Sequence, residues 1–311
     1  MRSVVVAPKG HLLLVGTTAS GKSALGLEAA RRRPGVELVS MDSMALYRGM
    51  DIGTATPSAA ERAEVPHHLL DLADPSEDYS VADFQRAARA ALADIGERDA
   101  RAVLVGGTGL HVRAVVDDLD IPGRFAQVRA GLDAEPDTPA LHRRLAELDP
   151  VAAGRMEPTN RRRVVRALEV TLGSGRPFSS YGPGLGQYPD TPFAQVGLRV
   201  PRDVLDARIA ERFARMMDEG LLDEVAGLLE RPEGLSATAA QALGYRELAV
   251  HLRGGCTLDA AVEESVAATR RFARRQERWF RRDPRIAWVD VGDDPLAALD
   301  EVLAAFDACA P

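Results

Sequence analysis

The stretch Gly16-Thr17-Thr18-Ala19-Ser20-Gly21-Lys22-Ser23 decides the fold of this chain. It matches the pattern Gly-x-x-x-x-Gly-Lys-Ser/Thr, in which a glycine-rich loop joins a strand to a helix and binds phosphate groups. The context agrees, because an apolar run at residues 11–15 precedes it and a helix-forming run at 23–30 follows it. The chain has only two lysines, Lys9 and Lys22, among 39 basic residues, so a lysine here is not a matter of composition. The stretch predicts a P-loop rather than a turn without chemical meaning.

Each part of this loop has an expected role. Backbone N–H groups at the helix start would bind phosphate oxygens, and Lys22 would place its charge on the far phosphates. The hydroxyl of Ser23 would reach a magnesium ion. The residues predicted to hold phosphate groups are Gly16, Thr18, Ala19, Ser20, Gly21, Lys22 and Ser23.

Composition excludes several classes of protein. With 311 residues, 46% hydrophobic and 27% charged, the chain is typical of a globular protein. No run approaches the ~20 apolar residues of a membrane span, and residues 8–11 interrupt the short apolar run after Arg2 before a signal peptide could form. Cys256 and Cys309 are too few for a disulfide framework or a paired-cysteine zinc site. We therefore expect a cytoplasmic protein with no membrane contact.

Charge is unevenly distributed along the chain. The net charge of −7 argues against a surface that coats nucleic acid, but residues 270–285 contain eight arginines and only two acids, Glu277 and Asp283. Four of these arginines are spaced by four residues and so share a helical face: Arg270, Arg274, Arg278 and Arg282. Few acids lie close to them in sequence, which favours phosphate contact over a solvated face.

Strand-like and helix-like segments alternate in the first part of the chain. Strands joined by helical crossovers imply a parallel sheet covered on both faces. Ser80 and Asp83 have the spacing of a capping box at one helix start, and Asn160 suits the N-cap of another helix. The predicted strands are 11–15, 36–40, 102–105, 195–200 and 286–291, and the predicted helices include 23–30, 81–95, 139–148 and 161–172.

Near residue 117 the pattern changes to charged, helix-rich sequence, and residues 176–192 form an irregular connection. We interpret residues 120–189 as a small helical insertion domain. Residues 1–119 and 190–311 then form an α/β core, a P-loop NTPase-like parallel sheet with C-terminal helices.

Asp42 and Thr108 each follow a predicted strand, so they lie with the P-loop at the carboxyl edge of the sheet, where ligands bind. Residues 42–57 mix an acid, hydroxyls and an arginine, which are binding-site residue types. Turn capping is the alternative for Asp42. For Thr108, a simple glycine turn is equally consistent with the string Gly-Gly-Thr-Gly.

Two absences disfavour an ATPase or GTPase. Residues 103–107 run into glycines without a hydrolytic acid, and the sequence has no Asn-Lys-x-Asp motif for reading guanine. The six histidines lack metal-ligand spacing, and we expect His67-His68 to lie in a loop.

Taken together, these stretches resemble the bacterial tRNA dimethylallyltransferases, also called tRNA isopentenyltransferases. The resemblance covers nearly the whole chain. The matching stretches are 16–23, 42–44, 51–55, 66–71, 79–84, 105–110, 166–170, 241–247 and 274–281.

The resemblance implies that a dimethylallyl group moves from dimethylallyl diphosphate to the exocyclic amino nitrogen of the adenosine 3′ of the anticodon. It implies that Asp42 is the general base, that Thr108 positions substrate and that Arg212 lies near the diphosphate. We expect Mg²⁺ as cofactor, from the P-loop serine, and a monomer. The tRNA anticodon stem-loop would contact Ser43, Met44, Ala45, Arg162, Gln241, Gly244, Tyr245, Arg274, Arg275, Gln276, Arg278 and Trp279.

The chain departs from the family pattern at four positions. Thr17 replaces a usual proline, Ala45 a common amidic residue, Thr56 a common lysine and His111 a common tyrosine. Two other functions remain open: a P-loop small-molecule or nucleoside kinase, which would use ATP as donor, and a nucleotide-switched RNA-binding protein without prenyl chemistry.

Overall fold

The computed structural model describes residues 10–182 and 184–309. The segment around Arg2, on which the signal-peptide argument rests, and Lys9 lie outside these residues. The chain divides into two compact units, Met1–Val116 with Asp190–Pro311, and Asp117–Pro189. The insertion domain predicted at residues 120–189 falls within the second unit.

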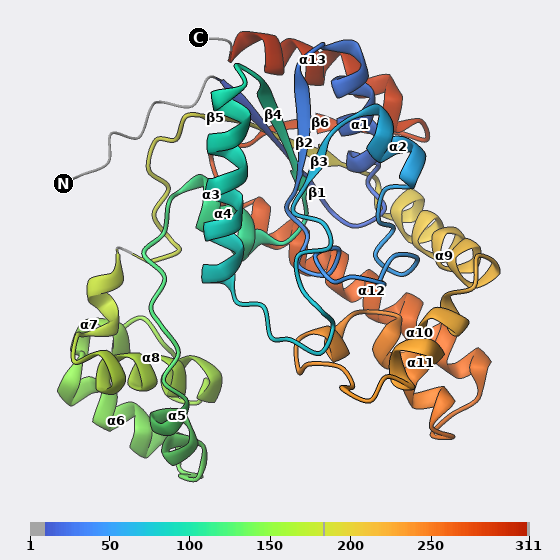
Figure 1. Ribbon diagram of the computed structural model, residues 1–311. Coiled ribbons are helices and arrows are strands. Elements are labelled where there is room, and N and C mark those ends of the chain that lie inside the picture. The colour runs from blue at the N-terminus through green and yellow to red at the C-terminus, as the bar shows by residue number, and fades with distance from the viewer. Residues whose placement is uncertain (1–9, 183, 310–311) are drawn as a thin grey trace. The chain divides into compact units, whose positions relative to one another are not determined.

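A six-stranded sheet organises the first unit, with strand order β3-β2-β4-β1-β5-β6 (Figure 1). Every neighbouring pair is parallel, as expected for strands joined by helical crossovers. The α/β class is confirmed, and the five predicted strands lie within two residues of the observed bounds. The strands are β1 His11–Gly16, β2 Val36–Ser40, β3 His67–His68, β4 Arg101–Gly106, β5 Phe193–Arg199 and β6 Ala287–Asp290.

The loop prediction for His67-His68 was wrong, because these residues form the edge strand β3. His67 pairs with Leu38 of β2, and His68 Nε2 lies 2.5 Å from Glu37 Oε2. A two-residue strand is too short to show the alternation by which a strand is recognised in sequence.

Side chains alternate across the sheet and build a core on each face. Leu13 and Val15 of β1 pack with helices α3, α4 and α12, whereas Leu12 and Leu14 pack with α1 and α13. This period of two is the pattern of a strand buried on both sides. These helices are α1 Lys22–Arg32, α3 Val81–Glu97, α4 Gly109–Val116, α12 Leu258–Phe280 and α13 Leu299–Ala308.

The remaining helices of the first unit are α2 Ala59–Glu64, α9 Arg202–Asp218, α10 Leu221–Leu229 and α11 Tyr245–Leu252. Three of them, α9, α10 and α11, contribute buried side chains to the same core as α3 and α12. Among the residues that the structure describes, no helix has the length and apolar character needed to cross a bilayer.

Both predicted helix caps are confirmed. At α3, the Asp83 N–H donates to Ser80 Oγ at 3.2 Å and the Ser80 N–H donates to Asp83 Oδ2 at 3.1 Å. At α8, which spans Arg161–Ser174, Asn160 Oδ1 accepts the Arg163 N–H at 3.4 Å. These side chains satisfy backbone donors that a helix start leaves unpaired.

The second unit is a small helical bundle with its own apolar core. Its helices are α5 Ala126–Asp133, α6 Thr138–Leu148, α7 Pro150–Ala153 and α8 Arg161–Ser174. Leu141 and Leu145 of α6 pack against Val164, Val165 and Leu168 of α8. Each helix buries one apolar stripe inside the unit, which explains why it forms a separate compact body.

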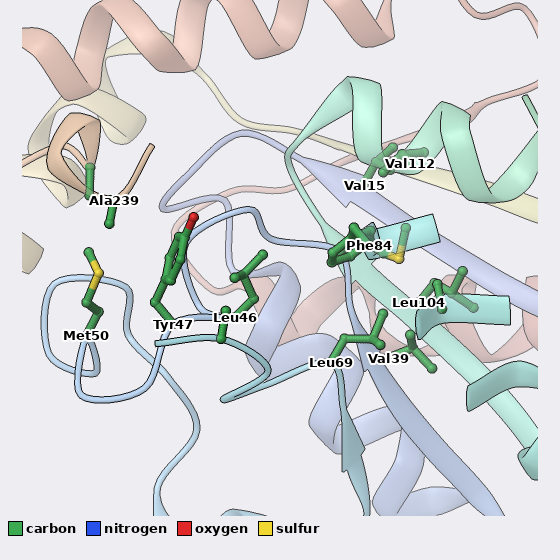
Figure 2. Packing of buried hydrophobic residues seen from close by; sticks show 14 of the residues in the cluster. Val15, Val39, Leu46, Tyr47, Met50, Leu69, Phe84, Leu104, Val112 and Ala239 are labelled. Atoms are coloured by element: carbon green, nitrogen blue, oxygen red, sulfur yellow. The ribbon is translucent and has the colours of Figure 1, made fainter. Parts of the chain in front are cut away.

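The loop that follows β2 is fixed by buried side chains of its own. Leu46 and Tyr47 are 1% exposed and Met50 is fully buried. Figure 2 shows these three side chains in one cluster with strand residues such as Val39 and with Ala239, toward which Met50 extends. An irregular loop thereby gains a fixed shape beside Asp42.

Candidate functional site

The P-loop between β1 and α1 has two residues in the left-handed backbone region, Ala19 with φ +61° and Gly21 with φ +89°. A non-glycine residue there costs on the order of 1 kcal/mol or more, and such strain is common at ligand sites. Glycine is required at position 21, because a Cβ would lie 2.3 Å from Cβ of Pro295. The loop is therefore held in a defined, strained shape.

The start of α1 has the features of an anion site. No side chain caps it, and its first turn contains no acid. The N–H groups of a first helical turn have no intrahelical partner, and the helix dipole is positive at this end. Lys22 Nζ donates to the Thr17 carbonyl at 3.1 Å, which holds the ammonium group against the loop.

Two of the residues predicted to bind phosphate use their N–H groups elsewhere. The Thr18 N–H donates to Gln276 Oε1 at 2.9 Å, and the Ser20 N–H donates to the Thr17 carbonyl at 3.2 Å. The Ser20 hydroxyl is buried under the loop, where Gly16 leaves room for it. The phosphate-binding donors left are those of Ala19 and the start of α1.

Lys22 and Arg212 bring two positive charges together beside Asp42. Burial, and next the Arg212 charge, lower the pKa of Lys22 to about 8, while Asp42 partly opposes both effects. Burial also lowers the pKa of Arg212, and the negative charge of Asp42 partly opposes this shift. Within residues 10–182 and 184–309, neither cation has a carboxylate at ion-pair distance. The site therefore has an excess of positive charge, which favours a ligand with several negative charges.

Asp42 uses one carboxylate oxygen to fix its loop. Its Oδ1 accepts the N–H of Met44 at 2.7 Å and the N–H of Ala45 at 3.4 Å. Asp42 therefore caps the turn, as in the alternative considered above, but only through Oδ1. Its Oδ2 accepts no hydrogen bond from the described residues. Asp42 is both a turn cap and a carboxylate with one oxygen available for a proton.

Thr108 lies next to the Asp42 loop because β2 and β4 are neighbours in the sheet. Its Oγ1 is 3.3 Å from Ser43 Oγ. A cavity of about 310 Å³, which we call the Asp42 cavity, opens in front of these residues. Its lining includes Thr18, Ala19, Asp42, Ser43, Met44, Thr54, Thr108, Arg212, Gln241, Arg246, Thr269 and Arg275.

An apolar wall of this cavity was missed by the sequence analysis. Ile209, Phe213 and Met216 of α9 line it, together with Leu243 and Phe272. The available signal was the spacing i, i+4, i+7 of the three α9 residues, which puts them on one helical face with Arg212. A polar floor with an apolar wall suits a ligand that is charged at one end and apolar at the other.

A second cavity of about 640 Å³ lies on the β5–β6 side of the P-loop, and we call it the Trp288 cavity. Its lining includes Gly16, Thr17, Leu198, Arg199, Arg202, Asp206, Arg270, Arg274, Glu277, Arg281, Trp288 and Asp290. Most of its arginines have acid partners. The ion pairs are Arg199–Asp290 at 3.3 Å, Arg202–Asp206 at 3.9 Å, Arg270–Asp206 at 3.8 Å and Arg281–Glu277 at 2.7 Å.

This pairing corrects the expectation for the C-terminal arginines. Arg270 pairs with Asp206 of α9, an acid far away in sequence, so it does not present its charge freely. Helix α12 ends at Phe280, so Arg282 does not share its face. Arg274, Arg275 and Arg278 are exposed, and none has a carboxylate partner in the part of the chain that the structure describes.

Tyr245 anchors the 42–57 loop instead of facing solvent. It is 1% exposed, and its hydroxyl donates to Glu224 Oε1 at 2.5 Å and accepts the Gly53 N–H at 3.1 Å. Glu224 Oε2 also accepts the N–H groups of Asp51 and Ile52, at 3.0 and 2.9 Å. Tyr245 nevertheless lines the Asp42 cavity, so its predicted contact with tRNA stays a prediction.

Gln276 is likewise buried, at 6% exposure. Its Oε1 accepts the Thr18 N–H, and its Nε2 donates to the Gly107 carbonyl at 2.9 Å. Both ends of the amide are used by protein backbone, so a direct contact with tRNA does not fit. Neither of its two partners was predicted from the sequence.

The other residues predicted to bind tRNA differ in exposure. Ser43, Met44 and Gln241 line the Asp42 cavity, and Arg162 is exposed on α8 of the second unit. Ala45 and Gly244 are buried, so neither presents a side chain to a ligand at the surface. Trp279 is partly buried and packs on the chain at Gly109, where a Cβ would lie 2.2 Å from Trp279 Nε1.

Besides Thr17 in the P-loop and Ala45 in the Asp42 loop, the other two departures from the family pattern also lie near this site. His111 is 8% exposed, and its ring contacts that of Phe84 with the centroids 4.6 Å apart. Burial lowers the pKa of His111 to about 4, although the charge of Asp42 acts to raise it. The imidazole is therefore neutral at pH 7. The Thr56 hydroxyl lies 2.8 Å from that of Thr54, within the loop.

The oxygen atoms at the site suit magnesium only together with a phosphate ligand. Ser23 is exposed at the start of α1, and Asp42 has one oxygen without a hydrogen bond. The described residues contain no cluster of three or more acidic, histidine or cysteine side chains that could hold a metal. Mg²⁺ commonly binds through one or two protein oxygens, water and substrate phosphates, and the residues present fit that mode.

Comparisons with known proteins agree on one family. Residues 45–283 match the family model described as IPP transferase. The chain is 50% identical to the tRNA dimethylallyltransferase of Kineococcus radiotolerans over 93% of its length and 94% of the relative. It is 49% identical to that of Thermobifida fusca, over 89% of both chains.

Solved structures give the same result. The tRNA isopentenylpyrophosphate transferase of Bacillus halodurans is 36% identical, with a TM-score of 0.70 over 97% of this chain and 98% of that one. A eukaryotic dimethylallyltransferase acting on tRNA is 25% identical, with a TM-score of 0.76 over 92% of this chain and 74% of that one.

Proposed function

The chain belongs to the IPP transferase family, and from that premise we propose that it moves a dimethylallyl group from dimethylallyl diphosphate to the adenosine 3′ of the anticodon in tRNA. It is a transferase that prenylates tRNA. The donor, the position in tRNA and the residue roles below are our proposal. We further propose that it acts as a monomer in the cytoplasm.

One observation carries the proposal for the site. Lys22 and Arg212 lie together without a carboxylate at ion-pair distance among the described residues, beside an aspartate with one oxygen available. This charge excess would hold a diphosphate. The apolar wall that starts at Ile209 and Phe213 would hold a short prenyl chain.

The proposed reaction is a displacement at carbon. The exocyclic amino nitrogen of adenosine forms a bond to the first carbon of the dimethylallyl group, and the bond from that carbon to the diphosphate oxygen breaks. Asp42 Oδ2 takes the proton from nitrogen, and diphosphate leaves with the bonding electrons. A positioned base and close alignment of the reactants together contribute several orders of magnitude.

The remaining residues stabilise the leaving group. Lys22, Arg212 and the N–H groups at the start of α1 would hold the negative charge that develops on the diphosphate. Ser23 would provide one oxygen to Mg²⁺, which when bound neutralises charge on the diphosphate. Thr108 would orient the base that enters the cavity.

The acceptor must reach this cavity as an unstacked base. Unstacking is less costly in a loop than in a duplex, which favours the anticodon loop as substrate. The exposed Arg275 and Arg278 of α12 would contact its phosphates, and Arg275 also lines the cavity.

The test compares two donors. The enzyme is incubated with unmodified tRNA and either dimethylallyl diphosphate labelled in its prenyl group or ATP labelled in its γ-phosphate. We expect prenyl label in the anticodon loop and none from ATP. Label transferred from ATP, or no transfer from the prenyl donor, would refute the proposal.

A further inference from the structure

We propose that Gln276 is a positioning residue for prenyl transfer, which couples the arginine-bearing helix α12 to the P-loop and to the loop that carries Thr108. The proposal rests on the function proposed above. Gln276 does not touch the reacting atoms. It holds the Thr18 N–H at 2.9 Å through Oε1 and the Gly107 carbonyl at 2.9 Å through Nε2.

Gln276 packs closely on Gly107. A Cβ at this position would lie 2.4 Å from Gln276 Nε2, so any other residue would displace the amide group. One helical turn further along α12, Trp279 packs in the same way on Gly109, where a Cβ would lie 2.2 Å from Trp279 Nε1. Thr108 therefore sits between two glycines that are both pressed against α12.

The same helix presents arginines on its outer side. Arg275 and Arg278 flank Gln276 in sequence, are exposed and have no carboxylate partner among the described residues. A helix is stiff over this distance, so a displacement of the outer face also displaces the inner one. Phosphates bound by these arginines would fix the position of Gln276 and, through it, of both loops.

The amide group is needed for both bonds at once. Oε1 must accept from Thr18 while Nε2 donates to Gly107, and these two atoms have opposite hydrogen-bonding roles. Leucine would leave a buried donor and a buried acceptor unpaired, which is costly. An ionised glutamate could still accept from Thr18 but would turn a second acceptor toward the Gly107 carbonyl.

The decisive variant is Gln276→Glu, because a protonated glutamate restores the missing donor. Its carboxyl group would again accept from Thr18 and donate to Gly107. We expect its rate of transfer at saturating substrates, relative to wild type at the same pH, to be about tenfold to 100-fold low at pH 8. That ratio should rise as the pH falls toward 5.5. A ratio that stays constant with pH overturns the proposal.

The second variant, Gln276→Leu, has a matched control in Gln85→Leu. Gln85 is also a buried glutamine, at 5% exposure, and its Nε2 donates to the Ala114 carbonyl at 2.6 Å, away from the site. We expect Gln276→Leu to lower kcat about tenfold to 100-fold, with tRNA affinity within about threefold of wild type. Equal losses of kcat in both variants would contradict a positioning role.

A third measurement tests the coupling itself. Inorganic diphosphate should change the affinity of the wild-type enzyme for tRNA by some factor. By linkage, tRNA should change the affinity for diphosphate by the same factor. In Gln276→Leu this factor should approach one, and an unchanged factor overturns the proposal. Wild-type transfer from dimethylallyl diphosphate is measured first. If it fails, the proposed function is wrong; if it succeeds and the variants behave as wild type, only this inference is wrong.

Discussion

The Asp42 cavity and the Trp288 cavity lie on opposite sides of the P-loop and differ in charge balance. The Trp288 cavity is the larger, at about 640 Å³ against 310 Å³, and more arginines line it. Four of those arginines pair with acids. In the Asp42 cavity, Arg212 has no carboxylate at ion-pair distance among the described residues, and the nearby Lys22 lacks one as well.

Because of this difference, our proposal places the phosphate site by unpaired charge rather than by cavity size. An arginine that already forms an ion pair has its charge largely balanced, and an anionic ligand would have to displace the acid partner. Partly buried cations without an acid partner, in contrast, gain the most from a ligand that neutralises them. The predictions below test this difference between the cavities.

The largest effect is expected from Asp42→Asn. This variant keeps the turn, since an amide oxygen can still accept from Met44, but it removes the proposed base. We expect single-turnover transfer to fall about 100-fold to 10,000-fold with little change in tRNA binding. Asp206→Asn in the Trp288 cavity is the control, with a change of about twofold or less. Comparable losses in both variants would remove the distinction between the cavities.

Lys22→Met should have the next largest effect. Loss of this charge at the leaving group should lower transfer about 100-fold to 1,000-fold. The pKa of Lys22 is about 8, so its ammonium charge is lost as the pH rises through that value. The affinity of wild type for inorganic diphosphate, measured by calorimetry, should therefore approach that of Lys22→Met above pH 8. A constant difference between the two from pH 7 to pH 9.5 would show that Lys22 stays charged.

The third effect concerns stability near Asp42. Burial lowers the pKa of His111 from 6.5 to about 4, so below pH 6.5 the unfolded chain binds a proton that the folded chain does not. Acidification from pH 7.5 to pH 5 should therefore lower the free energy of unfolding by about 2 kcal/mol through His111.

Urea unfolding at both pH values measures this loss. His11, whose pKa burial lowers in the same way, contributes a similar loss at the amino edge of the sheet. His111→Tyr should therefore lose about 2 kcal/mol less stability on acidification than wild type, because only the His111 contribution is removed. Equal losses in the two proteins would show that the His111 imidazole is not protected by burial.

The smallest effect separates two neighbouring arginines. Arg275 lines the Asp42 cavity and Arg274 the Trp288 cavity. Arg275→Gln should weaken tRNA binding and reduce the slope of log affinity against log salt by about one. Arg274→Gln should change that slope less. An equal reduction of the slope in both variants would mean that RNA phosphates extend over both cavities.

Much of this fold could be predicted because its signals are local. The P-loop, the caps at Ser80 and Asn160, and the strands around them each depend on residues within a few positions of one another. The same holds for Asp42 and Thr108, since parallel strands bring their carboxyl ends to one edge of the sheet. Chain order and strand pattern were enough to place these residues together.

The tertiary structure alone decided which side chains face a ligand. Gln276 and Tyr245 belong to stretches that predict tRNA contact, yet both are buried and bond to backbone of distant segments, Gln276 to Thr18 across 258 positions. Arg270 looked unpaired until α9 brought Asp206 to it. The sequence determined the strand, loop and helix of the P-loop, because local geometry depends on neighbouring residues. Charge balance and burial depend on which distant segments meet, and only the folded chain determines that.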